Sequence, residues 1–306
     1  MAMSALASAL EGEPAAAATT APAGSIAAYF ELAKGRLVLA ILAVVGATFL
    51  AAGGEPGWRL AAALVGTGAT AGAAGALNQW WEARWDALMD RTRGRPIPSG
   101  RIAARTALVF AAGLFSAGAV TLWLGCGPAP ALLAIVSAAV YVLAYTPLKR
   151  RTPLSLVPGA VSGALPVLIG AAAAAADPSP QVALLFVVLL AWQVPHTLAI
   201  DWRYREDYAR GGYRTLSRID PSGRATGRVA LIGAALTGAA SVGGLAWLGA
   251  GPGALLGALL VAVWLLAAAG ALWRVAGDEQ ARRLFRVTVL ALPAVLVVHL
   301  VPGLGS

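Results

Sequence analysis

Residues 78–101 read NQWWEARWDALMDRTRGRPIPSGR and follow an apolar run, Leu60–Leu77, that has the character of a membrane helix. Asn78, Glu82 and Asp86 in this stretch are spaced four residues apart. Each step of four advances about 40° around an α-helix, so the three side chains share one face. Their oxygen atoms are ligands that Mg²⁺ accepts. The spacing therefore predicts a divalent-metal site where this helix ends.

The second half of the stretch is basic. Arg91, Arg93 and Arg95 come next, and Pro96 and Pro98 then end any helix. Guanidinium groups bind phosphate oxygens well, so acids followed by arginines predict a metal–diphosphate site. Spacing alone leaves an alternative open, namely a hydrated, salt-bridged helix end whose arginines serve only as topology signals.

The composition is that of a helical membrane protein with many spans. The chain has 306 residues, of which 59% are hydrophobic and 12% charged, and its mean hydropathy is +0.74. The net charge of +9 resides in short segments between apolar runs, which indicates a membrane topology signal rather than nucleic-acid binding. Cys126 is the single cysteine, which excludes an intrachain disulfide and a cysteine-based metal site.

The chain divides into a predicted disordered tail, residues 1–24, and a single membrane domain, residues 25–306. The tail is rich in Ala, Thr and Pro and lacks the basic and apolar regions of a signal peptide. Nine apolar segments follow, and most are long enough for a bilayer that needs about 20 residues. We place them near residues 37–53, 59–80, 103–125, 129–147, 154–175, 180–201, 226–249, 253–273 and 284–303.

The basic residues between these segments fall on one side of the predicted topology, with Arg59 alone on the other. Cytoplasmic loops carry an excess of Lys and Arg. We therefore expect a multi-pass protein of the cell (inner) membrane, with the N-terminus and the site in the cytoplasm and the C-terminus outside. The residues on the cytoplasmic side are Lys34, Arg36, those of 84–105, Lys149–Arg151, those of 203–228 and those of 274–286.

A second charged loop follows the sixth segment, in the stretch 192–220, WQVPHTLAIDWRYREDYARGGYRTLSRID. Asp201 closes an apolar helix, and an acid at membrane depth is costly enough to need a reason. The functional interpretation is the second half of the metal–diphosphate site. The alternative is a hydrated loop in which Asp201 pairs with Arg205 four residues later. The loop also carries Glu206, Asp207 and Tyr208.

Two further features of the sequence allow a structural and a functional interpretation. His196 lies in an apolar segment, where a histidine is more often a satisfied core residue, but near a site it could ligate iron or shuttle a proton. Lys149, Arg150 and Arg151 end the fourth segment in the stretch 145–166, YTPLKRRTPLSLVPGAVSGALP. They serve as topology determinants, or Lys149 and Arg150 extend the phosphate-binding surface.

Three stretches together resemble the UbiA superfamily of intramembrane prenyltransferases, and within it the haem branch. They are LNQWWEARWDALMDRTRGRPIPSGRI at 77–102, YTPLKRRTP at 145–153 followed by GAVSGALPVLIG, and WQVPHTLAIDWRYREDYARGGY at 192–213. The D-x-x-M-x-R-T-x-x-R-P run at 86–96 and the YT-x-LKR-x-TP run are specific to the haem branch. The resemblance covers the chain from about residue 30 onward. It implies an all-helical bundle of nine transmembrane helices with a central cavity capped by cytoplasmic loops.

The resemblance also implies roles for individual residues. Asn78, Glu82 and Asp86 correspond to the first Mg²⁺–diphosphate motif. The second motif of the superfamily is commonly Asp-x-x-x-Asp, whereas here Arg205 stands four residues after Asp201. Which acids of this loop touch metal stays open between Asp201, Glu206 and Asp207. The implied catalytic groups are Asn78, Glu82, Asp86 and Asp207, the implied metal ligands are these four and Asp201, and the implied substrate-binding residues are Arg91, Arg95, Lys149, Arg150, Arg205, His196 and Tyr208.

The activity implied by the resemblance is transfer of the farnesyl group of farnesyl diphosphate to the vinyl group of haem B, giving haem O, with Mg²⁺ as cofactor. His196 is then a candidate axial ligand of the haem iron. The implied partners are the two substrates and the lipid bilayer, with no nucleic acid, and docking of a haem A synthase stays open.

The same residues leave three alternative functions open but favour them less. The acceptor could instead be an aromatic acid, a quinone precursor or a chlorophyll-type tetrapyrrole, although the runs at 86–96 and 145–153 disfavour these. A transporter would place its charges near the bilayer midplane, whereas the acids here gather at one predicted face. A purely structural subunit, such as an oxidase assembly factor, would leave the two acidic clusters unexplained.

Overall fold

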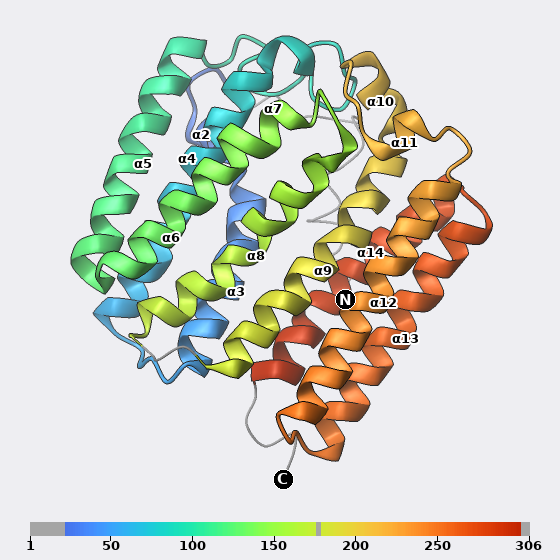
Figure 1. Cartoon of the computed structure of the whole chain (residues 1–306). Helices are drawn as coiled ribbons and strands as arrows, with labels where there is room; N and C mark the ends of the chain where they lie inside the picture. The colour runs from blue at the N-terminus through green and yellow to red at the C-terminus, as the bar shows by residue number, and fades with distance from the viewer. Residues whose placement is uncertain (1–21, 176–178, 301–306) are drawn as a thin grey trace. The chain divides into compact units, whose positions relative to one another are not determined.

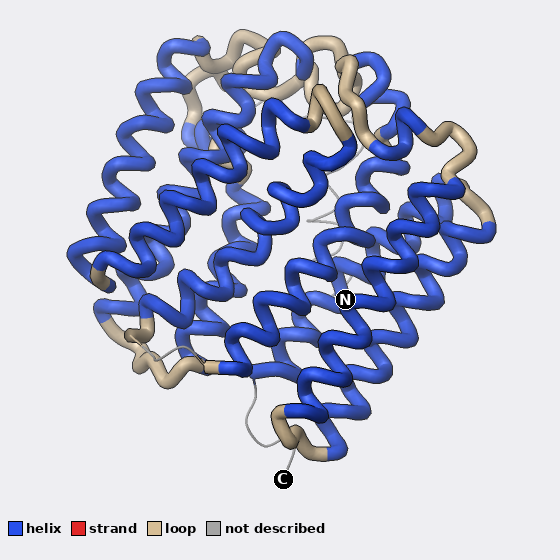
Figure 2. The backbone as a smooth tube through the Cα atoms, viewed as in Figure 1, coloured by secondary structure: helices blue, strands red, loops and turns tan. Residues whose placement is uncertain are grey.

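The structure is a computed structural model that describes residues 22–175 and 179–300. These residues form helices and loops, with no strand among them (Figure 2). Internal contacts divide them into an N-terminal unit, residues 22–175 and 206–214, and a C-terminal unit, residues 179–205 and 215–300. Residues 1–21 of the predicted tail lie outside the described residues, so its disorder stays a prediction.

The N-terminal unit begins with a short helix that is bent against the next one. Figure 1 labels the helices. The unit consists of α2 (Ile26–Leu32), α3 (Gly35–Ala51), α4 (Trp58–Asp86), α5 (Ala104–Cys126), α6 (Pro128–Ala139), the π-helix η1 (Val140–Tyr145), α7 (Thr146–Leu148), the 3₁₀ turn η2 (Pro153–Ser155), α8 (Leu156–Ala173) and most of α10 (Arg205–Arg210), of which η1 and η2 carry no label in the figure.

The C-terminal unit consists of four long helices and one short one. Helix α12 packs against α9 and α13, and α14 packs against the same two helices. Ser179 caps α9, since its side chain accepts a hydrogen bond from the Val182 amide, and Pro180 occupies the first turn, where no amide proton is needed. The helices are α9 (Pro180–Arg203), α11 (Leu216–Ile219), α12 (Arg224–Trp247), α13 (Pro252–Arg274) and α14 (Asp278–Leu300).

The predicted spans are confirmed as helices. Among the described residues, 8 helices are long and apolar enough to cross a membrane, and a ninth span results if α2 and α3, bent by 63°, count as one. Helix α4 continues beyond its apolar segment, which ends near residue 80, to Asp86. The acids of the first motif are therefore part of this helix, as their i, i+4 spacing predicts.

Small residues bring α4 and α5 close together in the N-terminal unit. A Cβ atom built on Gly118 would lie 2.7 Å from the Gly66 carbonyl oxygen, so the two backbones approach as only glycine allows. The opposite side of α5 exposes large apolar side chains, with Trp123 52% and Leu124 79% exposed. In a bilayer these side chains face lipid, which removes the cost that their exposure to water would carry.

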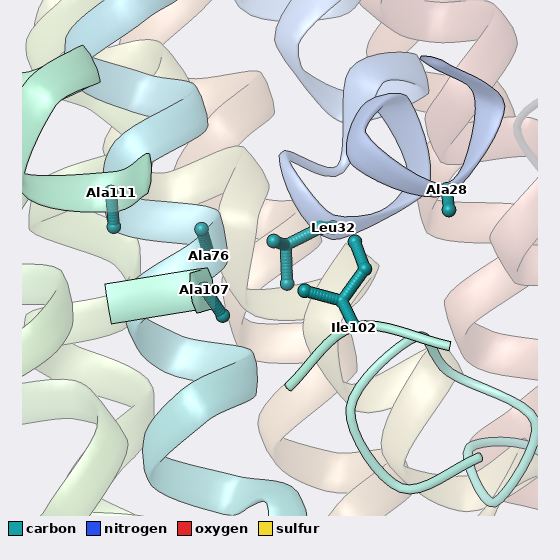
Figure 3. Packing of buried hydrophobic residues seen from close by; sticks show 6 residues of the cluster. All are labelled: Ala28, Leu32, Ala76, Ile102, Ala107 and Ala111. Atoms are coloured by element: carbon teal, nitrogen blue, oxygen red, sulfur yellow. The ribbon is translucent and has the colours of Figure 1, made fainter. Parts of the chain in front are cut away.

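A small apolar cluster holds α2 against α4, α5 and the loop that follows α4 (Figure 3). It consists of Ala28, Leu32, Ala76, Ile102, Ala107 and Ala111, all of them buried. Gln79 of α4 donates hydrogen bonds to the carbonyls of Glu31 and Leu32 at 2.9 and 3.1 Å, which satisfies the end of α2. The cluster therefore fixes two segments beside the last turns of α4, the bend after α2 and the basic loop 87–103.

Candidate functional site

The first motif lies on the buried side of the last turns of α4. Asn78, Glu82 and Asp86 are 1%, 3% and 0% exposed, and the i, i+4 spacing puts them on one face as the sequence predicted. Burying two acids within reach of each other is costly unless cations compensate. Basic residues from three other segments of the N-terminal unit surround these acids.

Arg95 is the first of these basic residues. The turns after α4 bring its Nη1 atom to 2.7 Å from Asp86 Oδ2. Burial lowers the pKa of Arg95, but the negative charges of Asp86 and Glu82 outweigh burial and raise it, so the guanidinium stays charged. The other carboxylate oxygen, Asp86 Oδ1, is buried and has no hydrogen-bond partner within the described part of the chain.

Lys149 provides the second cation, beside Glu82. Its Nζ atom lies 3.7 Å from Glu82 Oε1 and is enclosed by three tyrosine rings, with centroids 5.9 Å away for Tyr145, 4.8 Å for Tyr208 and 4.5 Å for Tyr213. Burial lowers the pKa of Lys149, but the Glu82 charge raises it well above its ordinary value. Burial raises the pKa of Tyr213, so this phenol stays neutral. Glu82 Oε1 is buried without a hydrogen-bond partner among the described residues.

A π-helical turn positions two of the aromatic side chains. Helix α6 continues into η1, where the Thr146 hydroxyl donates to the Tyr141 carbonyl at 2.8 Å, five residues earlier. Pro147 follows and has no amide proton to donate. Tyr141 and Tyr145, four positions apart in the sequence, stack in this segment with centroids 5.3 Å apart. Such π-turns inside helices are frequent at functional sites.

Lys34 is the third basic residue beside the motif, at a position where the sequence indicates only a topology signal. It lies in the bend between α2 and α3 with φ of 54°, in the left-handed region that costs a non-glycine residue about 1–2 kcal/mol. Its Nζ atom donates to Asn78 Oδ1 at 2.6 Å and to the Tyr141 hydroxyl at 2.8 Å. Asn78 Nδ2 in turn donates to Thr146 Oγ1 at 3.0 Å. Asn78 therefore has both ends of its amide fixed.

Part of the second charged loop lies beside the first. Asp207 accepts hydrogen bonds from the amides of Asp90 and Arg91 at 2.9 and 3.3 Å, and it pairs with Arg210 at 2.5 Å. The Arg91 guanidinium lies 5.9 Å from the Tyr208 ring. The carboxylate of Asp207 is thus engaged with the loop after α4 and holds the two loops together.

Arg150 lies near the same loops and makes a different contact. Its guanidinium carbon lies 3.8 Å from the centroid of the Trp85 ring, a cation–π contact that holds it against the last turn of α4. Gly212, with φ of 68°, lies close to the Arg150 guanidinium, because a Cβ atom at this glycine would be 3.2 Å from Arg150 Nη2.

Three predicted site residues belong to the C-terminal unit. Asp201 accepts hydrogen bonds from the amide and the hydroxyl of Ser217 at 3.0 and 2.6 Å. Arg205 forms an ion pair with Asp278. His196 contacts Thr288 Oγ1 through Nδ1 at 2.9 Å.

The chemistry of the donors limits what the first motif could hold. No group of three or more His, Cys, Asp or Glu residues suited to a metal occurs in the described ranges. Two buried carboxylate oxygens without hydrogen-bond partners, Glu82 Oε1 and Asp86 Oδ1, lie on the same helix face as Asn78. Hard oxygen donors of this kind fit Mg²⁺, which completes its coordination with water and substrate phosphate rather than with an all-protein cage.

Known proteins are similar in sequence to this chain over most of its length. Residues 39–290 match the UbiA prenyltransferase family. This chain belongs to the UbiA prenyltransferase family. As a UbiA prenyltransferase it is a multi-pass membrane protein, in agreement with its apolar helices.

Two relatives of this UbiA prenyltransferase are similar to it along nearly their whole length. The protoheme IX farnesyltransferase of Solibacter usitatus is 39% identical over 293 residues, covering 90% of this chain and 99% of the relative. That of Rhodopirellula baltica is 38% identical over 281 residues, covering 88% and 97%.

Solved structures share the fold of this UbiA prenyltransferase. A digeranylgeranylglyceryl phosphate synthase superposes with a TM-score of 0.73 at 17% identity, covering 90% of this chain and 97% of that one. A UbiA homolog from Archaeoglobus fulgidus bound to GPP and Mg²⁺ gives 0.59 at 14% identity, covering 90% and 100%. At these identities the similarity establishes the fold alone.

Proposed function

We propose that this chain transfers the farnesyl group of farnesyl diphosphate to the vinyl group of haem B, which gives haem O. Two relatives named protoheme IX farnesyltransferase, 39% and 38% identical along nearly their whole length, support the choice of both substrates. The runs at 86–96 and 145–153 support the same branch of the family.

One observation is the main support for binding of Mg²⁺ and diphosphate. Glu82 and Asp86 are buried side by side on α4, each with a carboxylate oxygen that lacks a hydrogen-bond partner among the described residues, and cations surround them. Glu82, Asp86 and Asn78 would hold Mg²⁺, for which the solved homolog bound to Mg²⁺ gives support by analogy. When bound there, Mg²⁺ would supply positive charge to the leaving diphosphate.

The cations of the N-terminal unit would stabilise that leaving group. In the reaction the bond between farnesyl C1 and the diphosphate oxygen breaks, and the electron pair stays on diphosphate. Arg95 and Lys149 are held charged beside the acids and would bind its oxygens, with Arg91, Arg150 and Lys34 close by. Fixed charges in a buried site lower the barrier because they need no reorganisation when the charge develops. Tyr208 would line the same site.

At the acceptor, the haem vinyl group forms the new bond to farnesyl C1. Water then adds to the resulting cation and loses a proton, which supplies the hydroxyl group of haem O. His196 would ligate the haem iron. The second loop would contribute to diphosphate or metal binding through Asp201, Asp207 and Arg205. A cytoplasmic position of this site and association with a haem A synthase stay predictions.

The test is turnover by purified, detergent-solubilised protein supplied with haem B, farnesyl diphosphate and Mg²⁺. Mass analysis of the extracted haem should show the addition of one hydroxyfarnesyl unit, and chelation of the metal should abolish it. Prenylation of a quinone precursor or another phenolic acceptor, with haem left unchanged, would overturn the acceptor. No prenyl transfer to any acceptor by folded protein would favour transport instead.

A further inference from the structure

His196 is held in a cluster that α9 and α14 contribute within the C-terminal unit. Its ring stacks on Trp192 with centroids 4.7 Å apart and an interplanar angle of 14°, and on Phe285 with 5.4 Å and 29°. Trp192 Nε1 also donates a hydrogen bond to the Thr288 carbonyl at 3.0 Å. The two helices are thus tied together at the residue that contacts the histidine, so the imidazole ring has little freedom to turn.

The hydrogen bonds around Thr288 define which ring nitrogen carries the proton. The Thr288 hydroxyl donates its only proton to the Phe285 carbonyl at 2.7 Å, since a carbonyl oxygen can only accept. Thr288 Oγ1, 2.9 Å from His196 Nδ1, must therefore accept a proton from that nitrogen. A neutral ring with its proton on Nδ1 has a free lone pair on Nε2. The structure gives Nε2 no hydrogen bond to any residue in the described ranges.

We propose that Thr288 is a positioning residue for haem: it holds His196 in the Nδ1–H form between Trp192 and Phe285, so that Nε2 is presented to the iron. The inference rests on the proposed function, which makes haem B the acceptor. A neutral imidazole nitrogen is a common axial ligand of haem iron, and the hydrogen bond at its other nitrogen sets the ring orientation.

The acceptor at His196 Nδ1 is a neutral hydroxyl, which suits haem that binds as a substrate rather than as a resident cofactor. A carboxylate at Nδ1 would make the imidazole a more basic and stronger ligand, as in resident metal centres. The Thr288 hydroxyl is neutral, so it fixes the tautomer without adding negative charge. Haem that enters as a substrate must leave as product, and a ligand of ordinary strength allows its release.

The tautomer can be measured directly, because His196 and His299 are the 2 histidines of the chain. Protein with ¹⁵N-labelled histidine should give two sets of ring signals, which a His299→Gln variant assigns. For His196 we expect a protonated Nδ1 and a bare Nε2. Thr288→Val removes the acceptor and should return the ring to the Nε2–H form, whereas Thr288→Ser should keep the wild-type form. A bare Nδ1 at His196 in the wild-type protein would overturn the inference.

Titration with ferric haem B, without farnesyl diphosphate, gives the second readout. Wild-type protein should show the absorption spectrum of histidine-ligated haem, and His196→Gln should lose it. Loss of a hydrogen bond to a metal ligand weakens binding about 10- to 100-fold, so Thr288→Val should raise the Kd by about tenfold or more. Thr288→Ser and His299→Gln should bind haem as the wild type does.

The outcomes separate this inference from the proposed function. Unchanged haem affinity in Thr288→Val, or an unchanged spectrum in His196→Gln, would overturn the role of Thr288 even if the protein farnesylates haem. Haem binding that depends on both residues would support that role, even if a parallel turnover assay showed no farnesylated haem and so overturned the proposed function.

Discussion

Asp86 is the position at which stability and chemistry can be tested separately. The residue is fully buried, and its Oδ2 atom lies 2.7 Å from Arg95 Nη1. Asp86→Asn keeps the shape of the side chain but removes the charge. Removing one partner of a buried ion pair costs about 3–5 kcal/mol, because the other ion stays buried. Glu82 also offers a negative charge to Arg95, so we expect a loss of stability near the lower end, about 3 kcal/mol.

Turnover should fall further than this loss of stability explains. Removing one group that stabilises developing charge costs about 10²–10³ in kcat, or about 3–4 kcal/mol of barrier. Initial rates of haem conversion should be measured at a temperature at which thermal unfolding in detergent shows the variant to be folded. Asp90→Asn is the matched control, one turn further along the chain. Its side chain is 57% exposed and pairs with Arg210, so rate and stability should stay near those of the wild type.

A double variant, Asp86→Asn with Arg95→Gln, completes the test. Replacing both members of a buried pair is often nearly neutral for stability, so the double variant should regain much of what the single one loses. Its turnover should stay as low as that of Asp86→Asn. Near-wild-type turnover in Asp86→Asn, or recovery of turnover together with stability in the double variant, would refute the catalytic role of Asp86.

The remaining predictions concern other parts of the molecule. Gly118→Ala should destabilise the protein by about 1–3 kcal/mol in thermal unfolding, because its Cβ atom would meet the Gly66 carbonyl at 2.7 Å, whereas Gly113→Ala in the same helix has no neighbour within 4 Å and should be tolerated. Lys149→Met should lower kcat/KM for farnesyl diphosphate about 10²-fold, with partial recovery in Lys149→Arg, and unchanged kinetics in Lys149→Met would contradict its phosphate role. Asp220 accepts hydrogen bonds from the amides at the start of α12, and although burial tends to raise its pKa, hydrogen bonds lower it. A lowered folded-state pKa means that this stabilisation is fully present above the ordinary aspartate pKa and is lost as the pH falls through the folded one. Asp220→Ala should therefore cost about 1 kcal/mol at neutral pH, and unfolding midpoints should converge with those of the wild type in acid.

Much of the fold could be predicted from the sequence because its determinants are local. Long apolar runs bounded by charges define the spans, and the i, i+4 spacing of Asn78, Glu82 and Asp86 places them on one face wherever the helix lies. Hydropathy falls near residue 80 while α4 continues to Asp86, so it is the spacing of the motif, and not the apolar run, that predicts the last turns of this helix. A buried polar face has the same composition as a loop, so hydropathy cannot separate the two.

The missed parts of the site depend on packing between distant segments. Lys34 stands between apolar runs like any topology signal, and only the bend between α2 and α3 turns its ammonium group onto Asn78. Tyr141 and Tyr145 stack where the helix widens into a π-turn ahead of Pro147, and hydropathy does not predict that turn. The proline and the paired tyrosines were the available signals.

The proposed metal–diphosphate site is tested most directly by a structure of the protein with Mn²⁺ in place of Mg²⁺ and a non-hydrolysable thio analogue of farnesyl diphosphate. Anomalous scattering would locate the metal independently of the protein atoms. We expect metal bound to Glu82 and Asp86, with the diphosphate in hydrogen-bond contact with Arg95 and Lys149. Metal and diphosphate bound elsewhere, with the Asp86–Arg95 pair unchanged, would contradict the proposed site.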